Sequence, residues 1–418
     1  MEANTHTGKV GLNEALQQWV DAHFDEQVAL LQRLVAIPTD TPPGDTAPHA
    51  EAVARLLEGW GWTVERHVVP DAEVQTYGMR SITNLVARRR YGAGGPVIAL
   101  NAHGDVVPPG EGWAHDPYGG EVVDGRLYGR ASAVSKSDFT TYLHAVRALE
   151  ASGAPLKGTV ELHFTYDEEF GGLKGPGWLL QRGLTHPDYV VCASFSHAVV
   201  TAHNGCLQFE VTVDGKATHG SAPKTGHDAL RAASCILAEI YRQADSLDDI
   251  HSNISGIDSP TMIVGCINGG TNTNVVPGRV VLKMDRRLIP EEDPTQVEAE
   301  VRAFILGAVA GLPGITVNIR RLLLARALRP LPGHERLVAS LQAHARQVFG
   351  EDIAAVGTPL YADARLYAEQ GIPTVMYGAG PRTVQESCAK QADEHVVLSD
   401  LLGATKVVAG LLGDFFAA

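Results

Sequence analysis

Two polar segments of the chain combine residue types that are suited to acid–base or metal chemistry. The triplet His-Gly-Asp at residues 103–105 follows an apolar run at 97–102, and Tyr-Asp-Glu-Glu at 166–169 follows an alternating segment at 159–165. Because the carboxyl ends of strands in an open α/β sheet border the ligand crevice, both segments are expected at one edge of a sheet. A carboxylate can fix the tautomer of a nearby histidine, and adjacent carboxylates can divide metal binding from general-base work. Each segment alone is also typical of an ordinary turn.

A second group of polar residues lies in the middle of the chain. His219 stands in a glycine-flanked segment, Asn274 precedes Val-Val-Pro, and Arg287 ends an expected strand. These three side chains suit an acyl oxygen and a carboxylate, since arginine offers a bidentate fork. Taken singly, each is also typical of a turn or of the surface.

The elements that would carry the first group alternate between strands and helices. This rhythm indicates an α/β fold with a mostly parallel sheet that is covered on both faces. Apolar runs predict strands at residues 97–100, 159–165, 189–193 and 374–377, and a helical period predicts helices at 12–37, 51–60, 138–151, 335–348 and 399–412.

The rhythm changes between these parts. Strands are expected at residues 206–213, 261–267, 279–285 and 315–319, with helices at 228–243 and 294–306. The order β-α-β-β-α-β is that of a ferredoxin-like unit. The sequence therefore predicts a discontinuous α/β domain, residues 1–205 and 322–418, and an inserted domain, residues 206–321.

Composition excludes several classes of function. Of 418 residues, 44% are hydrophobic and 20% charged, and the formal net charge of −14 argues against nucleic-acid binding. No apolar run approaches the ~20 residues that span a bilayer, and the first residues show no secretory signal. Five scattered cysteines without C-x-x-C spacing indicate reduced thiols, so we expect a cytoplasmic protein with no membrane partner.

A series of ordered motifs resembles the M20 peptidase and amidohydrolase family, which includes aminoacylase, acetylornithine deacetylase, succinyl-diaminopimelate desuccinylase and glutamate carboxypeptidase. The resemblance runs over nearly the whole length. Its motifs are His103-x-Asp105-Val106-Val107-Pro108, Trp113, Pro117, Gly129-Arg130, Asp167-Glu168-Glu169, Gly215-Lys216-Ala217-x-His219, Asn274-Val275-Val276-Pro277, Asp285-x-Arg287, Asp363-Ala364-Arg365, Gly371-Ile372-Pro373 and Asp393-Glu394.

The resemblance implies an enzyme that cleaves an amide in a small substrate with a carboxylate, such as an N-acyl amino acid or dipeptide. It also implies that the α/β domain is catalytic and that the inserted ferredoxin-like domain is a lid and dimerisation domain of a homodimer. Two divalent metals, usually zinc, would activate a water molecule. The roles that it assigns are general base for Glu168, metal ligand for His103 and Glu169, orientation of His103 for Asp105, oxyanion stabilisation from the partner subunit for His219, and substrate binding for Asn274, Arg287 and Arg365.

Three expected metal ligands are replaced in this chain. With Arg130 in register, the metal-bridging aspartate becomes Val134, the acidic ligand after the strand at 189–193 becomes Ser194, and the histidine four residues before Glu394 becomes Lys390. A one-residue change of register would instead bring Asp393 or His395 to the last position.

Charge arithmetic favours a site adapted to little or no metal. Glu168 and Glu169 remain with two negative charges and Lys390 adds one positive charge, so two further dications would leave buried positive charge uncompensated. We expect no cofactor, or at most a weakly held divalent ion (zinc or manganese), with Glu168 as acid/base and Lys390 and His219 stabilising negative charge.

Other interpretations stay open. Displaced ligands such as Asp138 or His197 would make the protein a conventional metal-dependent deacylase. In another interpretation, the protein binds a small molecule without catalysis. In a further one, the site catalyses an elimination or isomerisation that begins with proton abstraction.

Overall fold

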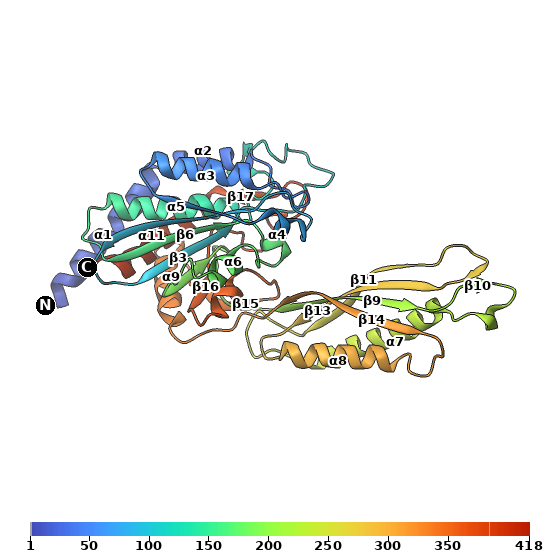
Figure 1. Ribbon diagram of the computed structural model, residues 1–418. Coiled ribbons are helices and arrows are strands. Elements are labelled where there is room, and N and C mark those ends of the chain that lie inside the picture. Colours follow the sequence, from blue (N-terminus) through green and yellow to red (C-terminus); the bar gives the residue numbers. More distant parts are fainter. Residues whose placement is uncertain (1, 384) are drawn as a thin grey trace. The chain divides into compact units, whose positions relative to one another are not determined.

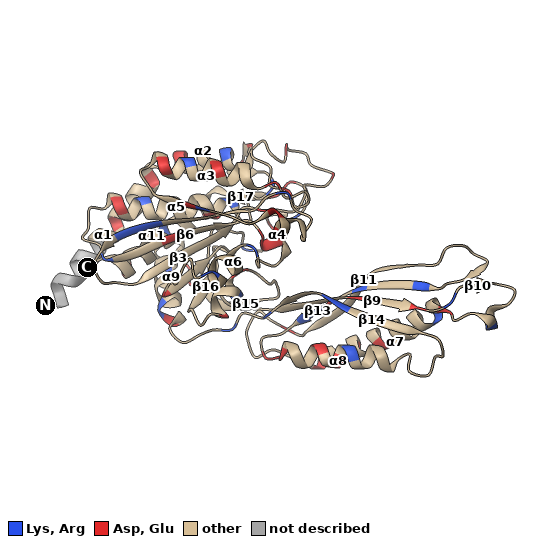
Figure 2. Cartoon of the chain, in the orientation of Figure 1, with Lys and Arg blue, Asp and Glu red and all other residues tan. Residues whose placement is uncertain are grey.

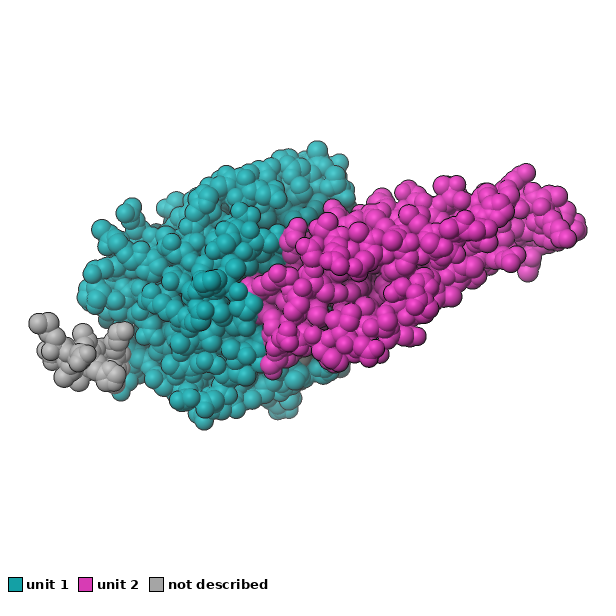
Figure 3. Space-filling model, turned by 90° about the horizontal axis from the view of Figure 1, so that it is seen from below, with its two compact units in different colours: residues 1–201, 330–356, 362–418 teal, residues 202–329, 357–361 magenta. Residues whose placement is uncertain are grey.

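The computed structural model describes residues 2–383 and 385–418, with side chains from residue 11 onward. The chain forms two compact units, coloured separately in Figure 3. Unit 1 comprises residues 1–201, Pro330–Val356 and Ala362–Ala418, and unit 2 comprises Ala202–Arg329 and Gly357–Tyr361. The sequence placed the inserted domain at 206–321 and gave residues 357–361 to the catalytic domain, whereas these five residues group with unit 2.

Unit 1 is built on an eight-stranded sheet with a parallel centre (Figure 1). The central strands pair in parallel and the outer strands are antiparallel, as the sequence predicted for a mostly parallel sheet. The order across the sheet is β1 (Val64–Val68), β2 (Thr83–Gly92), β6 (Gly158–Thr165), β3 (Val97–His103), β7 (Tyr189–Cys192), β16 (Thr374–Met376), β8 (Ala198–His203) and β15 (Ala354–Thr358).

Helices cover both faces of this sheet, because side chains alternate along its strands. On β6, Phe164 stacks on Phe139 of α5 (Lys136–Ala151), with ring centroids 4.1 Å apart, while His163 faces Tyr367 of α10 (Ala364–Ala368). The other helices of unit 1 are α1 (Glu2–Ala22), α2 (Phe24–Val35), α3 (Ala47–Gly59), α4 (Asp71–Gln75), α6 (Pro176–Gln181), α9 (His334–Phe349) and α11 (Leu398–Phe416). A small sheet holds β4 (Val122–Val123), β5 (Arg126–Tyr128) and β17 (His395–Val397).

The helix predicted at residues 12–37 is two helices, because the backbone leaves the helical region at His23 (φ −115°, ψ 14°). The apolar period does not reveal the break, since α1 and α2 both pack on α5. Strands β1 and β2 escaped prediction because charged residues interrupt their apolar pattern, and β8 and β15 were not predicted either.

Unit 2 has the predicted β-α-β-β-α-β order in one antiparallel sheet, β11-β13-β9-β14. Alternate residues of β9, from Leu207 to Val213, are buried against α7, and Asp228 caps that helix by accepting the N–H groups of Leu230 and Arg231. The elements are β9 (Gly205–Asp214), β10 (Thr218–His219), α7 (Ala229–Asp245), β11 (Thr261–Gly269), β12 (Val275–Val276), β13 (Arg279–Leu288), α8 (Pro294–Gly307), β14 (Thr316–Ala325) and the 3₁₀ turns Pro223–Thr225 and Ser246–Asp249.

Charged residues of both signs are interspersed on the helices. Figure 2 shows acidic and basic residues on each of α2, α3 and α8. Among the described residues, no helix combines the length and apolarity needed to cross a membrane.

Candidate functional site

The two polar segments singled out in the sequence meet at one edge of the unit 1 sheet. Strands β3 and β6 run parallel in register, so that His103 pairs with Thr165 where both strands end. The Gly104 N–H donates to the Thr165 carbonyl oxygen (2.8 Å). A Cβ on Gly104 would lie 2.3 Å from the Tyr166 ring, so this close approach of the two strand ends needs glycine.

Asp105 holds the turn that carries the two glutamates. Its fully buried carboxylate accepts the main-chain N–H groups of Glu168 (3.2 Å) and Glu169 (2.9 Å), which begin a short 3₁₀ turn, Glu168–Phe170. The Nδ1 of His103 lies 3.0 Å from the carbonyl oxygen of Asp105 and 3.5 Å from its carboxylate. The main-chain oxygen of Asp105 is thus the closer partner of the ring, and its side chain fixes the Glu168–Glu169 turn.

Charges are concentrated at this turn. The Nε2 of His103 lies 3.9 Å from Glu168 Oε2, and the Lys390 ammonium lies 2.6 Å from Glu169 Oε2. Burial opposes the charged form of His103, but the Glu168 charge and contacts with Asp105 outweigh it and raise the pKa to about 10. Burial, followed by the Glu168 charge, raises the pKa of Glu169 to about 7, against the opposing effect of Lys390.

The structure gives the surroundings of the three positions at which the sequence predicts replaced ligands. The hydroxyl of Ser135, the residue after Val134, accepts the main-chain N–H of His103 (3.3 Å). Ser194 follows strand β7. Lys390 adopts a left-handed backbone (φ 63°) and reaches Glu169. A valine, a serine hydroxyl and an ammonium are not ligands for a pair of divalent ions, so the residues present do not fit the two-metal centre that the resemblance implies.

The four residues considered as replacement ligands have other partners. The Asp138 carboxylate accepts the Ala379 N–H (2.7 Å), and burial raises its pKa to about 8. His197 lies between Glu351 (2.6 Å) and Asp400 (3.1 Å). Asp393 accepts the N–H groups of residues 114 and 115, and the Nδ1 of His395 contacts the Asp393 carbonyl oxygen (3.0 Å). Within residues 2–383 and 385–418, no three His, Cys, Asp or Glu side chains are grouped to hold a metal ion.

Arg365 lies inside unit 1 and not on a substrate-facing surface. It is 2% exposed, and its guanidinium donates to the Gly171 carbonyl oxygen (2.5 Å) and to Glu369 (3.2 Å). The predicted substrate-binding role does not agree with this burial, because both terminal nitrogens are engaged within the protein. The structure instead shows Arg365 bound to the end of the turn that carries Glu168.

The residues predicted in the inserted domain lie in unit 2. Pairing of β10 with β12 brings His219 opposite Val275, next to Asn274, and the Gly220 N–H donates to the Asn274 carbonyl oxygen (2.7 Å). The Ser221 N–H donates to His219 Nδ1 (3.2 Å). Because that ring nitrogen is an acceptor, the ring hydrogen of the neutral imidazole is on Nε2.

Arg287 lies at the other end of unit 2, on the four-stranded sheet and not on the β10–β12 pair. On β13, Arg279 pairs with Asp214 and Arg287 pairs with Cys206, which stands at the start of β9. Asp285 accepts the Nε–H of Arg287 (2.8 Å), and the Arg287 guanidinium carbon lies 5.5 Å from the centre of the Tyr361 ring. The contact with Asp285 orients the guanidinium.

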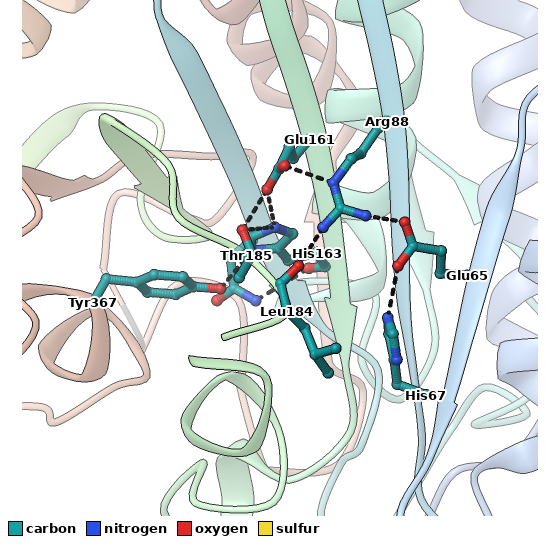
Figure 4. A network of polar contacts seen from close by, with 9 residues as sticks. Glu65, His67, Arg88, Glu161, His163, Leu184, Thr185 and Tyr367 are labelled. Carbon is teal, nitrogen blue, oxygen red and sulfur yellow. Dashed lines mark hydrogen bonds and ion pairs between the residues drawn. The ribbon is translucent and has the colours of Figure 1, made fainter. Parts of the chain in front are cut away.

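A buried polar network behind the site was not expected from the sequence (Figure 4). Glu161, His163 and Thr185 bond to one another, with Arg88 on one side and Tyr367 on the other. The signal that could have found it is the alternation of Glu161, His163 and Thr165 along a strand whose other face is apolar and buried. Polar residues at every second position of a doubly covered strand require buried partners.

Comparison with known sequences identifies the family. Residues 99–414 match the profile of Peptidase family M20/M25/M40. A succinyl-diaminopimelate desuccinylase of Methylorubrum populi is 27% identical over 412 residues, covering 94% of this chain and 98% of the relative. A desuccinylase of Gluconobacter oxydans is 31% identical over 274 residues, covering 63% and 67% of the two chains.

Solved structures share the fold. The di-peptidase Dug1p from Saccharomyces cerevisiae has a TM-score of 0.77 at 14% identity, covering 96% of this chain and 98% of its own. The M20 family metallo-carboxypeptidase Sso-CP2 from Sulfolobus solfataricus has a TM-score of 0.75 at 17% identity, covering 93% and 98%. The family predicted from the motifs is confirmed, and the chain belongs to Peptidase family M20/M25/M40, a family of hydrolases.

Proposed function

We propose that this hydrolase cleaves the C–N bond of an amide in a small substrate with a free carboxylate, such as an N-acyl amino acid or a dipeptide. The observation that carries the proposal is the position of Glu168. Asp105 fixes its main chain, its carboxylate lies beside His103, and the neighbouring Glu169 is paired with the Lys390 ammonium. A carboxylate held at the end of parallel strands is suited to general-base work.

The reaction uses one proton transferred by Glu168. Glu168 takes a proton from water while the water oxygen bonds to the amide carbon, and it then gives that proton to the nitrogen as the C–N bond breaks. A carboxylic acid and an amine are formed, and Glu168 returns to its carboxylate form. Lys390 and the Nε2–H of His219 donate hydrogen bonds to the oxyanion, and Asn274 and Arg287 bind the substrate carboxylate.

The proposal includes a site that lacks several of the metal ligands expected for the family. The family centre would require two dications, whereas this chain places one ammonium on Glu169. The Lys390 charge partly balances Glu168 and Glu169, so the site needs at most a weakly held divalent ion. The displaced-ligand alternative is not favoured, because Asp138 and His197 are bound to other groups.

A complete site needs two copies of the chain. Arg279 and Arg287 are eight residues apart on β13, which at 3.4 Å per residue is about 27 Å, and His219 lies beyond the Arg279 end. One small substrate cannot contact His219 and Arg287 of the same unit 2. We therefore propose that one substrate is contacted by Arg287 of one chain and by His219 and Asn274 of a second copy.

The edges of the unit 2 sheet support this dimer. Strand β14 has a register shift after Arg321 and carries Arg320 and Arg321, features that protect an edge from further pairing. Strand β11 also has a register shift, between Val264 and Cys266, but it has no charged residue along Thr261–Gly269, and its Ile263 and Ile267 are 56% and 50% exposed. Pairing of β11 with a second copy would cover these apolar side chains.

Glu168→Gln tests the chemistry. Turnover of N-acyl amino acids and dipeptides should be lost in Glu168→Gln, with the fold unchanged, and should persist in the control Glu335→Gln on α9. Incorporation of ¹⁸O from labelled water into the acid product identifies hydrolysis, whereas an unlabelled product indicates elimination or isomerisation. A fully active Glu168→Gln variant contradicts the proposal.

Metal analysis tests the depleted site. We expect less than one equivalent of zinc or manganese per chain and activity that survives chelation. Two equivalents of zinc with complete inactivation by a chelator would establish the conventional metal-dependent deacylase. Tight ligand binding without any turnover would leave a binding protein.

A further inference from the structure

The buried network in Figure 4 connects the sheet to α10 through a single histidine. His163 lies fully buried on β6, with Nε2 2.9 Å from Glu161 Oε2 and Nδ1 2.9 Å from the Tyr367 hydroxyl. Because an ionised carboxylate can only accept, the His163 Nε2–H donates to Glu161. In the neutral ring Nδ1 is then an acceptor, and the Tyr367 hydroxyl donates to it. The orientation of Tyr367 is thereby tied to β6.

The sheet side of the network is rigidly held. The Arg88 Nε–H on β2 donates to Glu161 (2.7 Å), and a terminal nitrogen of Arg88 donates to the Leu184 carbonyl oxygen (2.5 Å). The hydroxyl of Thr185 also donates to Glu161. Glu161 therefore has partners on two strands and on the segment that precedes β7, and His163 is fixed from behind.

The opposite side of α10 contacts the turn that carries Glu168 and Glu169. Arg365, two residues before Tyr367, donates to the Gly171 carbonyl oxygen (2.5 Å). Asp363, the residue that precedes α10, packs so closely on Gly172 that a Cβ there would lie 2.0 Å from Asp363 Oδ1. One short helix thus joins the buried network to the chain segment that immediately follows Glu168 and Glu169.

We propose that Tyr367 and His163 are positioning residues for Glu168, and that α10 transmits the orientation set by the buried network to the Glu168–Gly172 turn. The inference rests on the proposed function for the role of Glu168 but names residues that do not touch the substrate. Without the Tyr367 hydroxyl, α10 keeps its apolar packing but loses its only hydrogen bond to His163 among those described. The turn then samples positions in which the Glu168 carboxylate is misplaced, which lowers the catalytic rate more than substrate binding.

Hydrogen exchange of the full-length protein tests the connection. In Tyr367→Phe, amides of the peptide covering residues 166–175 should exchange about tenfold faster, while peptides from α5 change little. The matched control is Tyr377→Phe, because Tyr377 is also fully buried but its hydroxyl has no hydrogen-bond partner among the described residues. Arg365→Met should reproduce the faster exchange, and Arg365→Lys should restore part of the protection.

Steady-state kinetics provide the second measurement. In Tyr367→Phe, kcat should fall about tenfold while KM stays within about twofold. Unchanged exchange at residues 166–175, or an equal increase throughout unit 1, would overturn the inference. If exchange changes as expected but no wild-type turnover of any amide is found, the proposed function fails while the mechanical link between α10 and the turn stands.

Discussion

Replacing Glu161 by Gln should remove a large acid-sensitive part of the stability of unit 1. Burial opposes ionisation of Glu161, but hydrogen bonds from His163, Thr185 and Arg88 outweigh it and lower the pKa from 4.5 to about 2. The side chain is only 7% exposed, so solvent screens these contacts weakly. Because the pKa is lower in the folded protein than in the unfolded chain, the ionised form stabilises the fold. That stabilisation is present above pH 4.5 and is lost as the pH falls toward 2.

The magnitude follows from the two pKa values. A shift of about 2.5 units corresponds to about 3.4 kcal/mol at pH 7. The linkage relation leaves about 2.6 kcal/mol at pH 4 and about 1.4 kcal/mol at pH 3. Glu161→Gln has no ionisable group at this position, so this site should contribute no change in its stability as the pH falls. The free-energy difference between wild type and Glu161→Gln should therefore shrink by about 2 kcal/mol between pH 7 and pH 3.

Urea unfolding at pH 7, 5, 4 and 3, followed by the signal of unit 1 tryptophans, measures the difference. The control Glu65→Gln removes the outer and more exposed partner of Arg88 and should cost less than about 1 kcal/mol at pH 7. A gap between wild type and Glu161→Gln that stays constant from pH 7 to pH 3 would refute the reasoning. It would show that the buried hydrogen bonds do not favour the ionised carboxylate.

Three other perturbations probe the turn, the charge balance and the dimer. Gly172→Ala should destabilise the protein by about 2–4 kcal/mol in thermal unfolding, because φ is +73° and the new Cβ would collide with the Asp363 carboxylate. The control Gly110→Ala has a similar φ of +71° but open space around it, and it should cost only about 1 kcal/mol. Lys390→Met should lower kcat/KM at least about 100-fold with an unchanged circular dichroism spectrum, and an active variant would remove the ammonium from the mechanism. Ile267→Lys on β11 should give a monomer in sedimentation velocity, whereas Leu322→Lys on β14 should not.

The strands and residues at the sheet edge were predictable because two simple signals agreed. Apolar runs marked β3, β6 and β7, and polar residues of suitable chemistry stood immediately after two of them. In a parallel sheet, strand ends necessarily meet at one edge, so sequence order alone brought His103 and Glu168 together. The replaced ligands stay a prediction, which rests on the motif spacing around them.

The roles of Asp105 and Arg365 were not readable in the same way. Both lie in motifs, and their charged side chains suggested contacts with histidine or substrate. Arg365 instead binds the Gly171 carbonyl oxygen, and the Asp105 carboxylate, besides lying 3.5 Å from the His103 ring, accepts the N–H groups of Glu168 and Glu169. Backbone partners leave no trace in residue types, because every residue but proline offers the same donor and acceptor.

For Lys390, the balance of charges predicts its partner, which the residue pattern alone does not. The Lys390 side chain is 53% exposed, whereas its partner Glu169 is only 8% exposed, so the carboxylate is the buried member of the pair and the one that needs a compensating charge. In the proposed metal-poor site, no pair of metal ions balances Glu169, and the Lys390 ammonium supplies the positive charge instead. The ion pair at 2.6 Å is the arrangement that this balance demands. Restoring an aspartate at Val134 alone should therefore not restore metal binding, since the Lys390 ammonium would still repel a dication from Glu169.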